Sequence, residues 1–242
     1  LKQKLFSEYG LIISRLAIRK IDSGMKIYIR NRSVFQLDEQ PEHDILQLIC
    51  QKINPFLHEL VDEKTVIYLN SIYENNRGQI NHENSISFFK AKEIIIALLK
   101  EGVRLKPLDI ALETLFNLPP GIQIEEGVYE MRKRILPRYL GNLDGTDMYM
   151  LDQDDAVIIE ETLMQGNVLP FSVVKHLKEN LPDSENTVLV VFRCTSSYLK
   201  KTLGFTRTKI ISTEELPENF QGTKLSTIKI GLKDEIDFAS AY

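Results

Sequence analysis

The sequence predicts an α+β protein, with a helical first half and, in the second half, a mixed or mostly antiparallel sheet with two helices. Three observations lead to this prediction. Apolar residues recur at helical spacing through much of the first 120 residues. After Pro119-Pro120-Gly121, β-branched and alternating runs dominate. Only residues 170–181 and 196–203 have helical spacing there.

The chain has 242 residues, which is enough for one large domain or two small ones. Residues 74–85 form the most polar stretch and predict a loop at a domain boundary. We therefore expect a helical unit with a small β element over residues 1–80. A helical segment over 81–120 and a β-rich α+β domain over 121–242 would follow.

Within the first half, Asp22-Ser23-Gly24 predicts a turn, and the alternation after it predicts a hairpin from residues 25–31 and 33–37. A β-rich run at 65–69 predicts a further strand. Four other segments favour helix: residues 1–20, Pro41 to Ile53, residues 88–100, and Pro107 to Phe116. Ser85 or Ser87 would cap the helix over 88–100.

In the second half, six runs predict strands: "VYEMRKRIL", "DMYML", "AVIIEETLM", "TVLVVFRC", "TRTKIIS" and "STIKIGL". Asp144-Gly145 and residues 153–155 are interpreted as hairpin turns, because Asp and Gly are favoured in turns. On the strand after Ala156, Val157 and Ile159 would face one side of the sheet.

Composition restricts the function classes. The chain is 43% apolar and 26% charged, as in ordinary globular proteins, and its net charge of −4 argues against a dedicated nucleic-acid binder. It has no apolar run long enough to span a membrane and no signal-peptide core, so we expect a soluble protein. Because the chain begins at Leu1, not methionine, we expect either a trimmed chain or a domain of a longer protein.

The two cysteines, Cys50 and Cys194, are interpreted as buried thiols of a protein in a reducing, cytoplasmic compartment. Cys194 lies where a strand meets a helix, but no histidine is tied to it by sequence. We therefore expect Ser196 or Ser197 to cap the helix and Cys194 to pack in the core.

The four histidines are scattered, and none has a second ligand at the usual spacing, so no metal site is expected. Arg132 and Arg134 would share one face of a predicted strand, with Arg138 just beyond Pro137. Such guanidinium groups could clamp a phosphate or a carboxylate. The alternatives are a solvated sheet face paired with neighbouring acids, or a nucleic-acid interface.

The run "TVLVVFRCTSSYLKKTLGFTRTKI" and the upstream "QGNVLPFSVVKHL" resemble the end of the acyl-CoA N-acyltransferase (GNAT) superfamily. The resemblance implies that residues 156–164 form the central strand, and that Gln165, Gly166 and Asn167 belong to the loop that binds the pyrophosphate of coenzyme A. This sequence departs from the family pattern, because Val168 and Pro170 stand where small residues are needed, and proline has no N–H to donate.

The sequence therefore favours a non-catalytic interaction or regulatory module, with no cofactor, that binds a partner protein or a small anionic ligand. One alternative is an acyl-CoA-dependent N-acyltransferase with a degenerate pyrophosphate loop, which would use coenzyme A. A second alternative is a nucleic-acid-binding domain that uses Arg132, Arg134 and Arg138.

Overall fold

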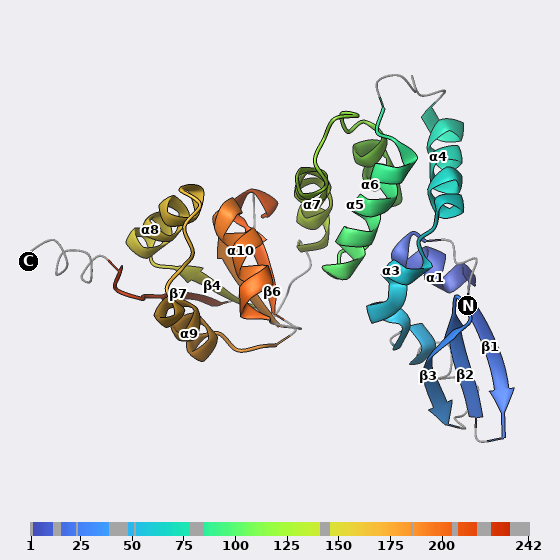
Figure 1. The fold of residues 1–242 in the computed structure, drawn as a ribbon, viewed down its shortest axis with the longest axis horizontal. Helices are drawn as coiled ribbons and strands as arrows, with labels where there is room; N and C mark the ends of the chain where they lie inside the picture. Colours follow the sequence, from blue (N-terminus) through green and yellow to red (C-terminus); the bar gives the residue numbers. More distant parts are fainter. Residues whose placement is uncertain are drawn as a thin grey trace, which may run out of the picture. The chain divides into compact units, whose positions relative to one another are not determined.

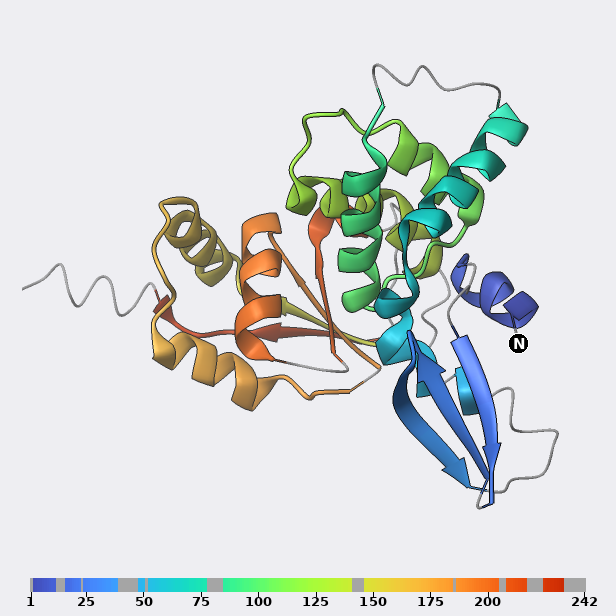
Figure 2. The same ribbon diagram turned by 45° about the vertical axis from the view of Figure 1, so that its right-hand side comes forward.

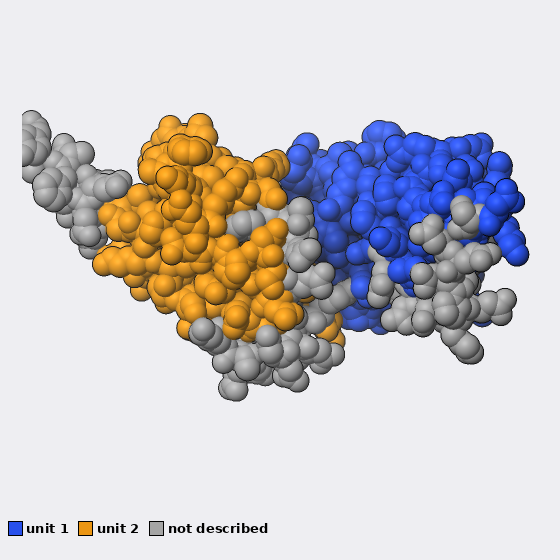
Figure 3. All heavy atoms as spheres, turned by 90° about the horizontal axis from the view of Figure 1, so that it is seen from below, with its two compact units in different colours: residues 1–135 blue, residues 136–242 orange. Residues whose placement is uncertain are grey.

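The structure is a computed structural model, and the α+β class predicted from the sequence is confirmed. It describes residues 2–11, 16–22, 24–38, 48–50, 52–77, 85–140, 146–184, 186–204, 208–216 and 224–232. The chain divides into two compact units, residues 1–135 and 136–242, which Figure 3 distinguishes by colour. Each unit is described by itself, and the three-part division expected from the sequence stays a prediction.

The first unit contains helix α1 (Lys2–Tyr9) and a three-stranded antiparallel sheet (Figure 1). Its strands are β1 (Leu16–Ile21), β2 (Gly24–Ile29) and β3 (Arg32–Asp38), in the order β1-β2-β3. The predicted hairpin is confirmed as β2 and β3. The helix predicted over residues 1–20 is wrong for residues 16–20, because β1 pairs with β2 from Leu16↔Ile29 to Ile21↔Gly24, and residues 12–15 lie outside the described residues.

The other described elements of the first unit are helices. Residues 48–50 and 52–53 are helical, whereas the start of the helix predicted from Pro41 lies outside the described residues. A 3-10 turn, η1 (Asn54–Phe56), and the short α3 (Leu57–Leu60) follow. The longer helices are α4 (Glu63–Arg77), α5 (Phe88–Lys100), α6 (Leu108–Phe116) and α7 (Ile124–Leu140), which continues past the boundary of the unit.

Helices α5 and α6 confirm the prediction. The Ser87 side chain caps α5 by accepting a hydrogen bond from the Lys90 backbone N–H. Gly102, just after this helix, has a φ of +74°, which glycine adopts without steric cost. At α6, Pro107 immediately precedes the first helical residue.

Two strands predicted before residue 140 are helices instead. Residues 65–69 lie in α4, where the Asp62 carboxylate accepts a hydrogen bond of 2.9 Å from the Thr65 N–H and so caps the helix. Residues 128–136 lie in α7, where Val128, Met131 and Ile135 are buried at helical spacing. Over so short a segment, the same apolar residues fit both the strand period of two residues and the helix period of about 3.6 residues. Tertiary packing then selects the helix.

The second unit contains a four-stranded sheet of β4 (Asp147–Leu151), β5 (Thr187–Val191), β6 (Lys209–Ser212) and β7 (Lys224–Ile228). The strand order is β6-β5-β4-β7, and every pairing between the described strands is parallel. The predicted mixed or mostly antiparallel sheet is therefore wrong. All five residues of β5 are buried, and a continuous apolar run of this kind is typical of a parallel strand covered on both faces.

The reason for the parallel pairing is the crossover between β4 and β5, which contains α8 (Gln153–Met164) and α9 (Phe171–Asn180). The strand predicted at 156–164 is therefore wrong. Residues 153–155, predicted as a hairpin turn, are the first turn of α8, and the Asp152 side chain accepts from the Asp154 N–H to cap it. The other predicted turn, Asp144-Gly145, lies outside the described residues.

The two helices predicted in this half are confirmed as α9 and α10 (Arg193–Leu203), and a short 3-10 turn, η3 (Thr213–Glu215), follows β6. Figure 2 shows α8, α9 and α10 beside the strands of the sheet. Leu189 and Val191 of β5 pack in one cluster with Ile159 of α8, Leu177 of α9 and Leu199 of α10. This cluster fixes the three helices on the sheet.

Candidate functional site

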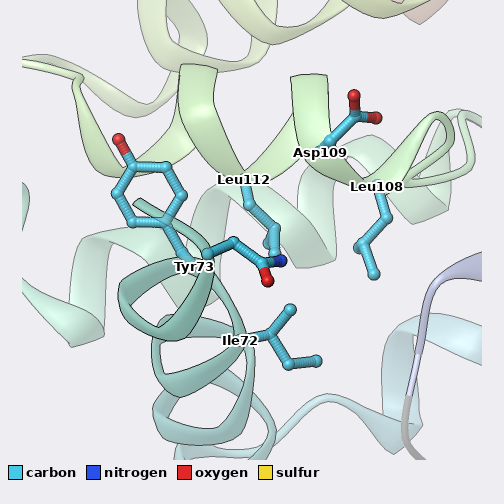
Figure 4. Close-up of a pocket in the computed structure, with 6 residues that line it drawn as sticks. Ile72, Tyr73, Leu108, Asp109 and Leu112 are labelled. Carbon is cyan, nitrogen blue, oxygen red and sulfur yellow. The ribbon is translucent and has the colours of Figure 1, made fainter. Parts of the chain in front are cut away.

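A groove lies between α4 and α6 in the first unit (Figure 4). Its volume is about 260 Å³, below the roughly 300–1,000 Å³ of pockets that hold drug-sized ligands. Its walls are mainly apolar, and they are formed by Ile72, Tyr73, Asn76, Leu108, Asp109 and Leu112. A groove of this size and polarity suits one apolar side chain of a partner better than a metabolite.

One wall of the groove is held rigidly. The Tyr73 hydroxyl accepts a hydrogen bond of 3.1 Å from Asn117 Nδ2, and the ring centroid of Tyr73 lies 5.6 Å from that of Phe116. Polar groups lie at the rim, and Figure 4 shows the Asp109 carboxylate pointing away from the apolar floor. Asp109 and Asn76 are exposed, and neither forms an ion pair or a side-chain hydrogen bond with another described residue.

The sequence predicted the helix that forms one wall of this groove, but not the groove itself. The stripe of α6 was visible in the sequence, but residues 65–69 were interpreted as a strand, so the α4 wall was missed. The missed signal is Asp62, three residues before Thr65, which is a common spacing for a residue that caps a helix. With that cap recognised, Leu69, Ile72, Tyr73 and Asn76 follow at helical spacing.

A second apolar surface lies at the corner between α8 and α9. Met164, Val168 and Phe171 are 72%, 74% and 80% exposed, although large apolar side chains gain free energy when they leave water. Scattered exposed apolar residues are ordinary, but a group within one short stretch is typical of an interaction surface.

The same corner holds Gln165, Gly166 and Asn167, which were predicted to bind a pyrophosphate. The structure places them at the C-terminus of α8, not between a strand and a helix. The N–H groups of all three residues donate to carbonyls of the preceding turn, and Gly166 has a φ of +77°, as in a helix-terminating Schellman motif. The backbone donors that a phosphate cradle needs are thus already used within the helix end.

The corner between β5 and α10 also differs from the expectation. Neither Ser196 nor Ser197 caps α10; the Glu160 carboxylate of α8 does so from a neighbouring helix. It accepts hydrogen bonds from the backbone N–H groups of Cys194 and Thr195, at 3.1 and 3.0 Å, and from the Thr195 hydroxyl at 2.7 Å. The positive end of this helix is therefore occupied by an internal anion.

This arrangement makes Cys194 a poor nucleophile. The residue is exposed at the surface, which corrects the expectation that it packs in the core, whereas Cys50 is buried as expected. Partial burial of the thiol, and then the adjacent Glu160 carboxylate, raise the pKa of Cys194 above its ordinary value. A raised pKa lowers the thiolate fraction at neutral pH, and the thiolate is the reactive form.

Asp155, in the first turn of α8, is a buried carboxylate. It is 1% exposed and accepts hydrogen bonds from the N–H groups of Ile230, Gly231 and Leu232, at 2.6, 3.0 and 2.8 Å. Burial, the largest single influence, raises its pKa, but the three N–H groups and Lys229 together bring the pKa below the ordinary value. The carboxylate thus fastens the segment after β7 to α8.

The three predicted anion-binding arginines lie on α7, so the shared strand face expected for them does not exist. Arg132 is 4% exposed and forms an ion pair with Glu101 at the end of α5. Arg134 and Arg138 are exposed and one helical turn apart, which brings them onto a common face that Arg132 does not share. An anion site at these residues stays a prediction.

In the described residues, no three histidine, cysteine or acidic side chains gather to form a metal site. Among the described helices, none is both long and apolar enough to cross a bilayer.

No protein-family model and no curated protein sequence matches this chain. Several solved structures match its fold. MxiA from Shigella flexneri matches with a TM-score of 0.69 and 14% identity, over 94% of this chain and 92% of that one. CdsV from Chlamydia pneumoniae, in its complex with CdsO, matches with a TM-score of 0.71 and 13% identity, over 91% of this chain and 88% of that one. The nonameric EscV cytosolic domain from the type III secretion system matches with a TM-score of 0.66 and 16% identity, over 94% of this chain and 90% of that one.

These matches correct the resemblance to the acyl-CoA N-acyltransferase superfamily, which is wrong. The element expected as the central strand of that fold is the helix α8, and the remaining strands pair in a parallel sheet. At 13–16% identity the matches establish architecture alone. The chain therefore has the fold shared by MxiA, CdsV and the EscV cytosolic domain.

Proposed function

We propose that this chain is a non-catalytic protein-interaction domain on the cytosolic side of a type III secretion system, where its copies associate in a ring and bind partner proteins. The observation that carries the proposal is the match of fold over 91–94% of the chain. One matching structure is described as a nonameric cytosolic domain of this system, and another as a complex with a second protein.

The surface of the chain supports an interaction role. The groove between α4 and α6 offers an apolar floor with exposed polar groups at its rim, which is the pattern of a protein-protein contact. The corner between α8 and α9 exposes three large apolar side chains. Each unit thus presents a separate apolar surface.

Sedimentation velocity over a wide range of protein concentrations tests the proposal. We expect species of several copies to grow with concentration, and ring-shaped particles in negative-stain images of the largest species. Ile72→Glu, which places a charge in the groove without touching the buried core, tests whether the groove is used between copies. Phe89→Glu on α5 is its control, since Phe89 is also apolar but lies outside the groove; Phe89 is exposed, whereas Ile72 is half-buried.

If the groove joins copies, Ile72→Glu will reduce the association and Phe89→Glu will leave it unchanged. Equal effects of the two variants would show that the groove is not part of the interface between copies, although the copies would still associate. A wild-type chain that stays monomeric at every concentration, and forms no particles, would contradict the proposed function.

A further inference from the structure

The small sheet of the first unit has two chemically different faces. Its inner face carries Ile27 and Leu37, which pack in one cluster with Ile49. The residues that alternate with them point outward. On that outer face, Arg19 of β1 lies directly across from Lys26 of β2.

The two cations of the outer face, Arg19 and Lys26, have no carboxylate partner among the described side chains. The Arg19 guanidinium carbon lies 4.8 Å from the centroid of the Tyr28 ring, a cation–π contact that holds the side chain over the sheet. Neither Arg19 nor Lys26 forms an ion pair with a carboxylate of the described residues, Asp22 in the adjoining turn included. Like charges directly opposite each other destabilise a strand pair, so this pairing weakens the sheet and favours an external anion.

The edge of the sheet adds a second kind of binding group. Among the described strands, β1 pairs only with β2, so one row of its backbone N–H and C=O groups faces away from the sheet. Figures 1 and 2 both show β1 at the outer side of the three strands. Residues 17–20 of this strand are all exposed, including Ile18, and Lys20 projects on the face opposite to Arg19.

We propose that β1 and the outer face of β2 bind an extended, acidic segment of a partner protein, which adds to the sheet beside β1. Its backbone would pair with the open edge, and its carboxylates would lie opposite Arg19, with Lys26 one strand further. An acidic peptide fits better than a nucleic acid, because only a peptide supplies backbone groups for the edge, and the chain as a whole carries a charge of −4.

This inference rests on the proposed function, since it names the chemistry of one partner. The test uses fluorescence anisotropy of a short, capped peptide that alternates glutamate with valine or threonine, at near-physiological salt. The test variant is Arg19→Gln/Lys26→Gln. Its control is Lys64→Gln/Lys178→Gln, which removes the same charge from two exposed lysines outside this sheet. Circular dichroism confirms that both variants are folded.

We expect the test variant to bind the peptide about fivefold more weakly than wild type, and the control less than about twofold more weakly. A peptide with lysine in place of glutamate should not bind. No binding to wild type, or equal losses in both variants, would overturn the inference. An equally strong response to a single-stranded oligonucleotide of the same charge would also overturn it, in favour of nucleic acid.

The two proposals can fail separately. Sedimentation of the wild-type chain without peptide decides whether copies associate, and that result does not depend on Arg19 or Lys26. A chain that assembles but ignores the acidic peptide would retain the proposed function and lose this inference.

Discussion

Two sets of charged side chains, one in each unit of the chain, have opposite effects on the fold. In the second unit, Asp155 and Glu160 are directed at backbone N–H groups, with three donors on the first and two on the second. In the first unit, Arg19 and Lys26 lie side by side on an open sheet face and pair with no carboxylate of the described chain. The carboxylates hold elements of the fold together, whereas the cations weaken the strands that carry them.

This difference separates architecture from recognition. A charge that is buried and fully hydrogen-bonded stabilises the fold, and removing it exposes unsatisfied donors. An exposed charge beside a like charge contributes nothing favourable until an opposite charge arrives. Substitutions of these two kinds of charge should therefore change stability in opposite directions.

The largest effect is expected at Asp155. Asp155→Ala leaves the N–H groups of residues 230–232 without their acceptor, and should lower the free energy of opening of the second unit by roughly 3 kcal/mol. Hydrogen exchange with mass spectrometry measures this unit by unit. The control Glu161→Gln, on the exposed face of the same helix, should change it by less than about 0.5 kcal/mol. Equal effects would mean that the Asp155 bonds do not fasten the segment.

Acid should imitate this substitution. Because the pKa of Asp155 is lowered in the folded chain, its contribution is present above the ordinary value of 3.8 and is lost as the pH falls below it. Wild type should therefore be more stable than Asp155→Asn at neutral pH, and this difference in stability should disappear only below that value. An advantage that disappears near neutral pH would contradict the assignment.

A somewhat smaller loss is expected at the ion pair between α5 and α7. Arg132→Met removes a buried cation from the partly exposed Glu101, and should destabilise the first unit by about 2 kcal/mol. Arg134→Met, on the exposed side of α7, is the matched control and should cost less than about 0.5 kcal/mol. Hydrogen exchange of α5 and α7 measures both. Equal losses would show that the position of Arg132 is not distinctive.

A reactivity change is expected at Glu160. Glu160→Gln removes the charge beside Cys194, so the pKa of the thiol should fall and alkylation by iodoacetamide at pH 8 should accelerate. The weaker cap should cost about 1 kcal/mol. Mass spectrometry locates the label, and the buried Cys50 reports any general unfolding. Unchanged or slower labelling of Cys194 would contradict this role of the carboxylate.

The smallest effect has the opposite sign. Lys26→Gln relieves the repulsion across β1 and β2, and should stabilise the first unit by about 0.5 kcal/mol. Lys64→Gln, an exposed lysine on α4, should leave the stability unchanged. A clear loss of stability in Lys26→Gln would show that this lysine serves the fold.

How far the sequence predicted the fold depends on how local the signals were. The hairpin of β2 and β3 was predictable because its strands are adjacent and one face is solvated, which produces alternation. Helices α5 and α6 were predictable from caps and stripes. The helices at 128–136 and 156–164 were not predictable, because short β-branched or apolar runs fit both the helix and the strand period. The choice between helix and strand depends on packing partners that are distant in the sequence.

The candidate site divides in the same way. The α6 wall of the groove follows from its apolar stripe, whereas the α4 wall required recognition of Asp62 as a cap. The Glu160 cap and the Asp155 fastening join residues 34 to 77 positions apart, so neither could be predicted from local spacing. The pairing of Arg19 with Lys26 also depends on a strand, β1, that the sequence favoured as a helix.

The most direct test of whether Arg19 and Lys26 serve a partner and not the fold measures two properties of Arg19→Gln/Lys26→Gln in the same preparation. These are the stability of the first unit, by hydrogen exchange, and the affinity for the acidic peptide, by anisotropy. We predict that stability is unchanged or higher while affinity falls about fivefold. Lower stability with unchanged affinity would contradict the account, because these cations would then serve the fold and not a partner.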